Sequence, residues 1–174
     1  MSFFQNTCKP KGLGGSLMVN MMNIGHSPIA EWGLKHIKIN KNDISLDVGC
    51  GGGANIKKLL EKSPKGKVFG IDYSEVSVRK SKKVNKFAVE RKHCEILQGN
   101  VQELPFANET FDLATAFETI YFWSDIDQSF SQIYRVLKKG GIFMVCNESN
   151  GENDKDKKWT EIINCLLYTS DAAD

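Results

Sequence analysis

The chain has 174 residues, of which 41% are hydrophobic and 25% are charged, as in an ordinary globular protein. Its 23 basic and 21 acidic residues leave a net charge of +2, which gives no case for a nucleic-acid or membrane partner. No apolar run approaches the length of a membrane span. The first residues also lack the charged start and apolar stretch of a signal peptide.

The cysteines point to a reducing environment. They stand at positions 8, 50, 94, 146 and 165 and form no C-x-x-C pair, so we expect no metal site. Cys50, Cys94 and Cys146 lie in or beside predicted strands, which indicates buried free thiols. We therefore expect a cytoplasmic protein.

Two short helices are predicted near the start of the chain, the first over residues 17–22. Ser27 followed by Pro28 predicts the start of the second, with the serine as N-cap. Its inner face would contain Ile29, Trp32, His36 and Ile37. Two interpretations remain open: these helices could simply cover the sheet, or, as the family resemblance described below implies, they could form a lid over the cofactor.

The most informative feature is a glycine-rich turn between a strand and a helix. Residues 44–48 predict a buried strand, Gly49 to Gly53 form the turn, and residues 55–62 have helical spacing. Glycines permit a tight turn and let a ligand approach bare backbone, and free N–H groups at a helix N-terminus point toward such a ligand. The next strand, 68–72, ends in Asp72, whose carboxylate would lie beside the turn and accept bonds from ribose hydroxyls.

Further strands and helices alternate along the rest of the chain. Ser74 predicts the N-cap of a helix to about Arg91, which is strongly basic and has Phe87 on its apolar side with Val84. Because this helix offers no aromatic platform for bases, its charges indicate a solvated face. A third strand is predicted at 94–98.

The last predicted helix begins at Ser124 or Asp125 and ends at Gly140-Gly141. Its apolar face would contain Ile126, Phe130, Ile133, Tyr134 and Leu137. A strand at 142–145 follows. The alternation predicts an α/β fold, a Rossmann-like, doubly wound and mostly parallel sheet in a three-layer αβα arrangement, with ligands at the carboxyl ends of the strands.

Five ordered motifs resemble those of class I S-adenosylmethionine-dependent methyltransferases. They cover roughly residues 40–149 and are most similar in style to the ubiquinone and menaquinone C-methyltransferases, a small-molecule branch. The motifs are Asp47–Gly53, Phe69–Ser74, Gly99–Phe106, Phe111–Glu118 and Arg135–Gly141. One departure is Asn100, where the family often has aspartate.

The resemblance implies S-adenosylmethionine as cofactor and a role for each matching residue. Asp47, Gly49, Cys50 and Gly51 would contact its methionine part. Asp72 would bind the ribose, and Tyr73, Asn100 and Val101 the adenine, while Phe117 and Glu118 would border the transferable methyl. Plainer interpretations remain: Asp47 could cap the next helix, Tyr73 could be a surface residue, and Glu118 could only satisfy a loop amide.

Methyl transfer requires no particular catalytic side chain, because the methyl carbon is already electrophilic. Tyr121 is a weak candidate for a base and Trp123 for a wall of the acceptor site, although both could be core residues. His26 is the best placed histidine, in the expected lid. The motif after the fourth strand, Phe117-Glu-Thr-Ile, is unlike the Asn/Asp-Pro-Pro-Tyr of nucleobase and amide methyltransferases, so we expect a small-molecule acceptor and no nucleic acid.

A rival hypothesis is an NAD(P)-dependent oxidoreductase. Gly49-x-Gly51-x-x-Ala54 satisfies the dinucleotide pattern, and Tyr134-x-x-x-Lys138 has the spacing of a short-chain dehydrogenase active site. That pair, however, would precede the fifth strand, away from the strand ends where catalysis occurs.

A third hypothesis is a fragment without activity. Residues 166–174 resemble a translated sequencing-adapter read-through, and the family's sheet normally closes with two further strands, so we expect a C-terminal truncation. We expect a helical lid segment at 1–40, the cofactor-binding domain at 41–149, and an incomplete region with a non-native tail at 150–174. The oligomeric state is not indicated.

Overall fold

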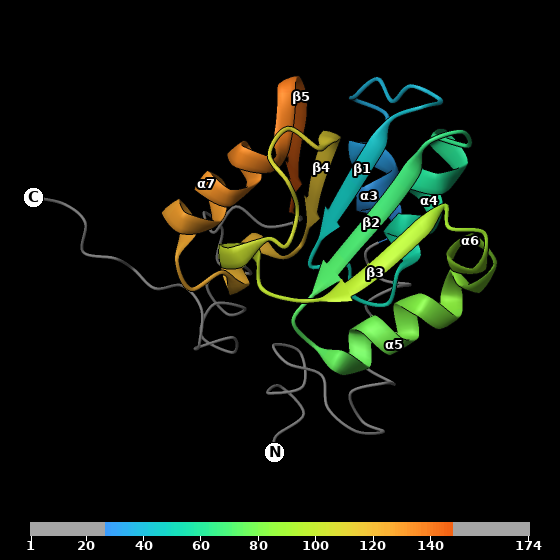
Figure 1. The fold of residues 1–174 in the computed structure, drawn as a ribbon, viewed down its shortest axis with the longest axis horizontal. Helices are drawn as coiled ribbons and strands as arrows, with labels where there is room; N and C mark the ends of the chain where they lie inside the picture. The colour runs from blue at the N-terminus through green and yellow to red at the C-terminus, as the bar shows by residue number, and fades with distance from the viewer. Residues whose placement is uncertain (1–26, 148–174) are drawn as a thin grey trace, which may run out of the picture.

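A computed structural model describes residues 27–147 and shows a parallel sheet of five strands in the order β3-β2-β1-β4-β5 (Figure 1). The strands are β1 (Ile44–Val48), β2 (Lys67–Asp72), β3 (Cys94–Gln98), β4 (Phe111–Phe117) and β5 (Leu137–Cys146). The helices are α3 (Ser27–Gly33), α4 (Ala54–Lys62), α5 (Glu75–Val84), α6 (Lys86–Glu90) and α7 (Ile126–Val136), with 3-10 turns η1 (Val101–Glu103) and η2 (Ile120–Phe122).

The order of the strands defines where a ligand would bind. The chain moves outward from β1 to β3 on one side and then returns to place β4 and β5 on the other, so the order reverses between β1 and β4. In open α/β sheets, ligands bind at the carboxyl ends of the strands beside such a switch point. The predicted Rossmann-like α/β fold is confirmed.

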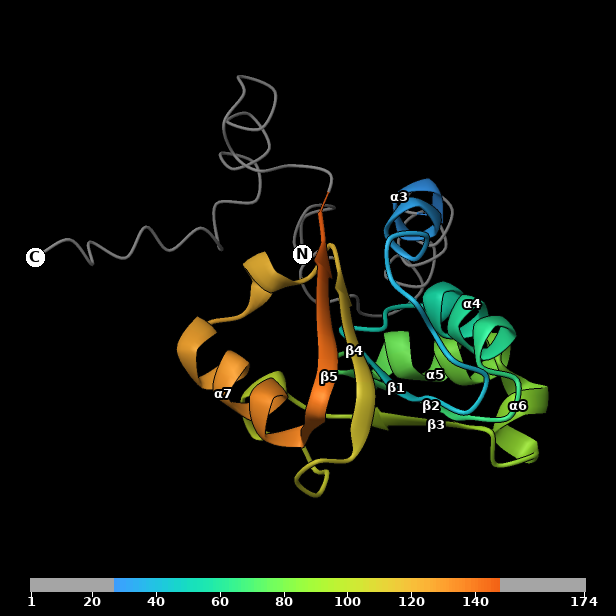
Figure 2. The same cartoon turned by 90° about the horizontal axis from the view of Figure 1, so that it is seen from above.

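Helices cover both faces of the sheet (Figure 2): α3, α4, α5 and α6 lie on one side and α7 on the other. Each face has its own hydrophobic cluster, called here the α3–α6 cluster and the α7 cluster after the helices that cover it. The hydrophobic side chains of β1 belong to the α7 cluster, and its alternate side chains point to the other face. Leu46 and Val48 pack in the α7 cluster, whereas Ser45 and Asp47 alternate with them and are also buried. The aspartate is therefore a core residue of the strand as well as a neighbour of the glycine turn.

The helix predicted from Ser74 to about Arg91 is interrupted. Ser74 does cap it, because its side chain accepts a bond from the backbone of Ser77, but α5 ends at Val84 and α6 begins at Lys86. The apolar side assigned to this helix was wrong, since Phe87 is 77% exposed. Val84 is exposed as well. The packed positions of α5 are instead Ser77, Val78 and Ser81.

The transition from α7 to β5 also differs from the prediction. Asp125 caps α7 through the backbone of Gln128, as expected, but the helix ends at Val136 and not at Gly140-Gly141. Both glycines lie inside β5, which pairs with β4 across a register shift between Phe111 and Leu113. Phe111 pairs with Leu137 and Leu113 with Ile142, so β5 begins directly after α7, before the two glycines.

The inner face of the N-terminal helix was only partly predicted. The buried hydrophobic residues are Ala30 of α3 and Leu34 just after it, which pack on the α3–α6 side of the sheet. Trp32 is 60% exposed and its ring contacts the exposed His36 ring, so both lie on the outer face. This helix thus covers the sheet. The predicted helix at 17–22, His26 and the tail at 166–174 lie outside the described residues.

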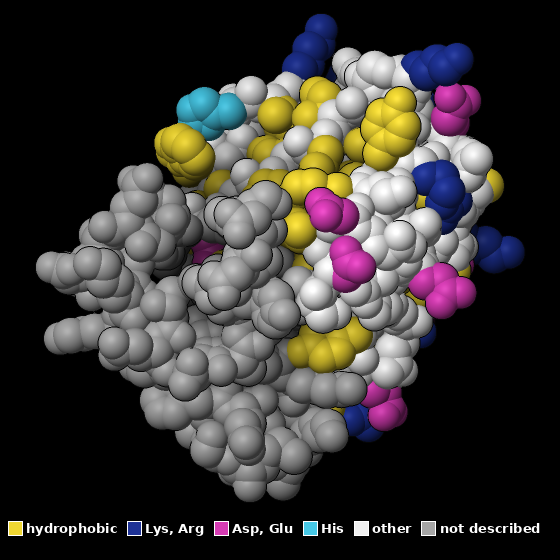
Figure 3. Space-filling view, turned by 90° about the vertical axis from the view of Figure 1, so that its left-hand side faces the viewer, with side chains coloured by type: hydrophobic (Ala, Val, Ile, Leu, Met, Phe, Trp, Pro, Cys, Tyr) yellow, Lys and Arg dark blue, Asp and Glu magenta, His cyan; other side chains and the backbone are white. Residues whose placement is uncertain are grey.

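One edge of the described sheet is formed by β5. Figure 3 looks at this side of the molecule and shows exposed hydrophobic side chains among charged ones. Ile142 and Val145 of β5 belong to the exposed hydrophobic residues. No helix within residues 27–147 is long and apolar enough to cross a membrane.

Candidate functional site

The turn after β1 follows the path that the glycines predict. Gly49, Gly51 and Gly53 all have positive φ, of 72°, 50° and 82°. Residues with a Cβ adopt this left-handed backbone conformation only at a cost in free energy, so glycine is the favoured residue at each position. Gly53 is also the N-cap of α4, which has no side-chain cap. Asp47 therefore does not cap this helix.

Backbone bonds tie the turn to β2. The N–H groups of Gly49 and Cys50 both donate to the carbonyl of Ile71, at 2.8 and 3.0 Å. The N–H of Gly51 donates to Oδ2 of Asp72 at 2.9 Å. The expectation that free N–H groups of the turn point toward a ligand is therefore wrong for these three residues, because the strand beside them already uses these donors.

The surroundings of the three glycines differ. A Cβ at Gly49 would lie 2.6 Å from the side chain of Thr119, and one at Gly53 would lie 2.4 Å from Oγ of Ser81. A Cβ at Gly51 would meet no described atom within 4 Å. The turn is thus packed at both ends and open in the middle, which leaves the backbone of Gly51 accessible.

Asp72 holds the end of β2 against the turn. Its Oδ1 accepts from the N–H of Ser74 at 2.8 Å, and its Oδ2 accepts from Gly51. Only 8% of the residue is exposed, and burial raises the pKa of its carboxyl although these bonds oppose the rise. The side chain of Ser77 also donates to this carboxylate. A carboxylate has about four acceptor sites, so about one remains for a ligand.

Asp47 is a buried carboxyl with one unused oxygen. It is 1% exposed, and Oδ1 accepts from the hydroxyl of Thr115 on β4 at 2.8 Å. Oδ2 has no hydrogen-bond partner among the described residues. Burial, with a further contribution from the charge of Asp72, raises its pKa to about 7. Thr115 was not singled out from the sequence, because only its register opposite Asp47 reveals the pair.

Cys50 takes part in this turn through its backbone, and its thiol is not reactive. Its side chain is buried, and burial raises the pKa of the thiol well above its usual range, as do the neighbouring Asp72 and Asp47 carboxyls. A thiol of this kind is not a nucleophile. Cys50, Cys94 and Cys146 are all free and buried, as predicted.

The end of β4 brings a carboxylate to the same edge of the sheet. Glu118 is 7% exposed and has a φ of 55°, an uncommon value for a residue other than glycine. Its N–H donates to the carbonyl of Cys146 at 3.0 Å, and its Oε2 accepts from the hydroxyl of Tyr121 at 2.6 Å. Thr119, which the sequence did not single out, donates to the carbonyl of Val48 at 3.2 Å and fixes this segment beside the turn.

Of two other predicted residues at this end, Phe117 is packed in the core and Trp123 is partly buried at its edge. Phe117 is 5% exposed and belongs to the α3–α6 cluster. Trp123 packs against the rings of Phe130 and Phe143, with centroids 6.1 and 6.4 Å away. The indole therefore has a structural role, and its contact with an acceptor stays a prediction.

The residues predicted to bind adenine line the edge beside β2 and β3. Tyr73 is 39% exposed, and its carbonyl accepts from the side chain of Gln98. Asn100 is exposed and exchanges two bonds with Gln102, whose N–H it caps at 3.1 Å. The side chain of Val101 is buried in the α7 cluster, so only its backbone can reach a ligand.

Comparison with known proteins agrees with this arrangement, because residues 46–145 match a family described as "Methyltransferase domain". The chain belongs to that family. The chain is 32% identical over 126 residues to 24-methylenesterol C-methyltransferase 3 of Arabidopsis thaliana, a match that covers 70% of this chain and 35% of that protein. It is 29% identical over 120 residues to a demethylmenaquinone methyltransferase of Lactobacillus johnsonii, covering 68% and 49%.

Solved structures of methyltransferases have the same fold. The putative methyltransferase in a complex with the Haloferax volcanii Trm112 methyltransferase activator superposes with a TM-score of 0.77 at 25% identity, covering 84% of this chain and 63% of that one. The resemblance to class I S-adenosylmethionine-dependent methyltransferases is thus confirmed. The chain spans about a third to a half of the two curated relatives named above.

In this methyltransferase domain, the residues of the rival oxidoreductase hypothesis do not form a site. Tyr134 is 83% exposed on α7, which also corrects its assignment to the apolar face. Lys138 lies at the start of β5 and pairs with both oxygens of Asp112 at 2.8 Å. The pair is therefore at the amino end of the strands, opposite the glycine turn.

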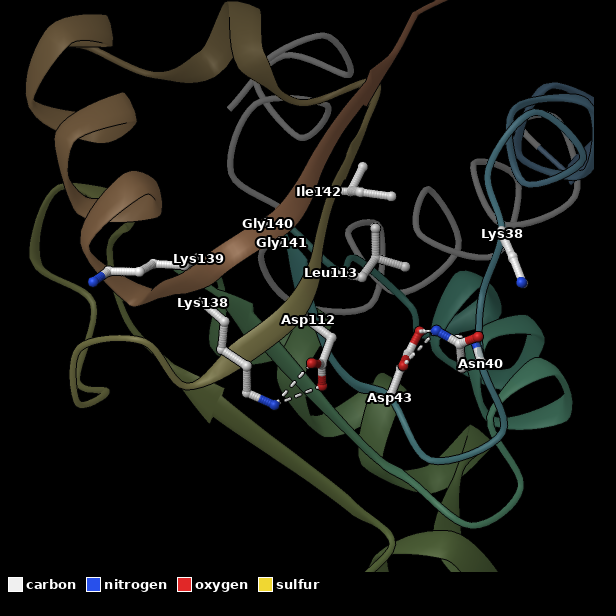
Figure 4. Close-up of a pocket in the computed structure, with 10 residues that line it drawn as sticks. All are labelled: Lys38, Asn40, Asp43, Asp112, Leu113, Lys138, Lys139, Gly140, Gly141 and Ile142. Atoms are coloured by element: carbon white, nitrogen blue, oxygen red, sulfur yellow. Dashed lines mark hydrogen bonds and ion pairs between the residues drawn. The ribbon is translucent and has the colours of Figure 1, made fainter.

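A hollow of about 180 Å³ lies at that amino end, between Lys38, Asp43, Asp112 and Lys138 (Figure 4). Its two carboxylates already have partners, because Asp112 also accepts from the N–H of Ile44 at 2.8 Å and Asp43 accepts from Asn40. These contacts fasten the start of β1 to β4 and β5. The described residues contain no group of three or more His, Cys, Asp or Glu side chains that could hold a metal ion.

Proposed function

We propose that this domain binds S-adenosylmethionine at the carboxyl ends of β1, β2 and β4 and transfers its methyl group to a small-molecule acceptor. The observation that carries the proposal is the open backbone of Gly51 between two buried acids. Gly51 has room for a ligand, Asp72 lies 2.9 Å from its N–H, and Asp47 has an unused oxygen below the same turn.

The methionine part of the cofactor is a zwitterion that also carries a sulfonium. Gly49, Cys50 and Gly51 would pass it over their backbone, with the bare Cα of Gly51 as the open point, since their N–H groups are already bonded. Asp47 would supply negative charge, because a cation near a buried carboxyl favours the charged form. The unused Oδ2 supports this role over a purely structural one.

The nucleoside part requires acceptors for the ribose and a flat surface for the adenine. Asp72 would accept from a ribose hydroxyl with its remaining acceptor site. The half-exposed ring of Tyr73 would flank the base, and the amide of Asn100 with the backbone of Val101 would bond its edge. Asn100 would have to exchange its bonds to Gln102 for bonds to the base.

The cofactor, when bound, supplies an electrophilic methyl group with a neutral leaving group. The residues of the chain then have to hold the acceptor in line and exclude water. Phe117 and Glu118 would border the methyl at the end of β4. Tyr121, whose hydroxyl donates to Glu118 at 2.6 Å, would orient the acceptor or take its proton, and Trp123 would form the wall behind. His26 remains a further candidate.

Two relatives support a small acceptor, since their names give a methylenesterol and a demethylmenaquinone as the molecules that they methylate. The aromatic sequence Tyr121-Phe-Trp123 agrees with an apolar acceptor. We propose that nucleic acid is not a substrate and that the protein acts in the cytoplasm, where its free thiols would stay reduced.

Calorimetric titration of the purified chain tests the cofactor. S-adenosylmethionine and S-adenosylhomocysteine should bind with micromolar affinity, and NAD should not. Binding of NAD alone would overturn the proposal in favour of an oxidoreductase. Binding of none of the three by a folded sample would favour the fragment without activity.

A further inference from the structure

Asn85 interrupts the helical segment that follows the nucleotide-binding edge. It stands between α5 and α6 with φ −103° and ψ 24°, and only 5% of it is exposed. Asparagine is seldom so buried unless its amide is bonded. The burial of this amide therefore requires hydrogen-bond partners inside the protein.

The amide of Asn85 reaches the glycine turn. Its Nδ2 donates to the carbonyl of Gly53 at 2.9 Å and to the carbonyl of Ser81 at 3.1 Å. The same nitrogen would lie 2.6 Å from a Cβ at residue 53. Two residues 32 positions apart in the chain are thus joined by a buried bond at the point where the turn becomes α4.

Ser81 occupies the space beside this bond. Its Oγ would lie 2.4 Å from a Cβ at Gly53, and it accepts from Sγ of Cys50 at 4.0 Å. It is completely buried. The end of the turn at Gly53 therefore packs against two polar residues, Ser81 of α5 and Asn85, which follows that helix.

We propose that Asn85 is a positioning residue for cofactor binding, which braces the carbonyl of Gly53 so that the open Gly51 keeps its place relative to Asp72. The inference rests on the proposed function for its effect on affinity. Without the brace, the turn would still be tied to β2 through Gly49 and Cys50, but its exit into α4 would lose its only side-chain donor among the described residues.

The variant Asn85→Asp isolates the donor, because it preserves the shape and replaces the NH₂ group by an oxygen that faces two carbonyls. At pH 8 we expect Kd for S-adenosylhomocysteine to rise about tenfold or more, the effect of one lost buried bond. Burial beside two carbonyl oxygens would raise the pKa of the new carboxyl, so at pH 5 more of it is protonated and can donate again. The ratio of variant to wild-type Kd should therefore fall. Asp47, Asp72 and Cys50 also titrate near the turn but are common to both proteins.

The matched control is Ile133→Val, which removes a methylene from the α7 cluster on the other face of the sheet. It should lower the melting temperature without changing Kd. If Asn85→Asp behaves like this control, with a lower melting temperature and wild-type Kd at pH 8, the proposal is wrong. Should Asn85→Asp not fold, Asn85→Ala replaces it, and the same two results decide.

Amide hydrogen exchange separates this inference from the proposed function, since it needs no ligand. In the free protein at pH 8, Asn85→Asp should accelerate exchange at residues 51–57 relative to the rest of the chain, and Ile133→Val should not. Unchanged exchange there would refute the brace. Absence of binding by wild type, with accelerated exchange in the variant, would refute the cofactor while confirming the brace.

Discussion

Asp72 and Gly51 are joined by a hydrogen bond of 2.9 Å between a carboxylate oxygen and a backbone N–H, 21 residues apart in the chain. The acid that would bind the ribose is therefore also the acid that holds the middle of the glycine turn. If Asp72 binds the ribose as we propose, cofactor recognition and the conformation of the turn depend on the same side chain. This coupling makes Asp72 the position where substitution should have the largest effect on affinity.

The first prediction concerns Asp72→Ala. The substitution removes the ribose acceptor and leaves the N–H groups of Gly51 and Ser74 without their partner. We expect the Kd for S-adenosylmethionine to rise about 100-fold, as two lost charge-assisted bonds would cause. Calorimetry measures it, with Asp43→Ala as the control, because within residues 27–147 the side chain of Asp43 bonds Asn40 alone. Unchanged affinity would refute the ribose assignment.

The second prediction compares two glycines with similar backbone and open surroundings. Gly51 has φ 50° and Gly140 has φ 78°, and a Cβ at either meets no described atom within 4 Å. Valine at either position should cost about 1–2 kcal/mol of stability through backbone strain.

Only Gly51→Val should abolish cofactor binding, because its side chain occupies the space where a ligand approaches the turn. Gly140→Val, at the opposite end of the sheet, should bind as wild type does. Melting temperature and Kd of both variants make the comparison. Retained binding by folded Gly51→Val would show that the turn is not the site.

Several of these relationships could be predicted from the sequence, and the reasons are local. The alternation at Leu46 and Val48 identifies β1. Ser74 and Asp125 could be predicted as N-caps because their side chains bond the backbone of the helix that directly follows them. The carboxyl-end position of Asp72 follows from the parallel topology. The roles assigned to the individual site residues, and the boundaries of the three segments, remain predictions.

The features that could not be predicted depend on contacts between distant segments. Asn85, at the break between α5 and α6, bonds the distant Gly53, and Thr115 bonds Asp47 because the strand register places the two opposite each other. Tyr134 has the spacing of the apolar face of α7, but its side chain is exposed and does not pack in the core. Spacing within one helix does not reveal how wide its packed face is.

The third prediction concerns the pH dependence of stability. The folded-state pKa of Asp47 is about 7, raised by burial above the ordinary 3.8, so the folded protein binds a proton that the unfolded chain has released. Stability should therefore fall as pH rises from about 4 to about 7, by up to about 1.4 kcal/mol per pH unit. Asp72, also raised, acts in the same direction.

Asp47→Asn should remove much of this dependence, because an amide remains neutral and can still accept from Thr115. Urea unfolding at pH 5 and pH 8 measures it, as the difference in unfolding free energy between the two conditions. A variant that loses stability between pH 5 and pH 8 as steeply as wild type would show that Asp47 does not carry the proton.

The fourth prediction concerns the opposite end of the sheet. Burial acts to raise the pKa of Asp112, but bonds from the N–H of Ile44 and from Lys138 lower it below its ordinary value. Its contribution to stability is therefore present above the ordinary pKa and is lost as pH falls. Asp112→Ala should cost about 1–3 kcal/mol at pH 7 and leave cofactor affinity unchanged. Urea unfolding measures the stability, and calorimetric titration measures the affinity. A large loss of cofactor affinity would contradict the claim that the amino end of the sheet is separate from the cofactor site.

The most direct measurement of the central claim is an amide chemical-shift titration of the isotopically labelled chain with S-adenosylhomocysteine. The account predicts that the largest changes fall at residues 49–53, 72–74, 100–101 and 117–118, which meet at the carboxyl ends of the strands. Changes centred on Asp112 and Lys138, or spread without a focus, would contradict it.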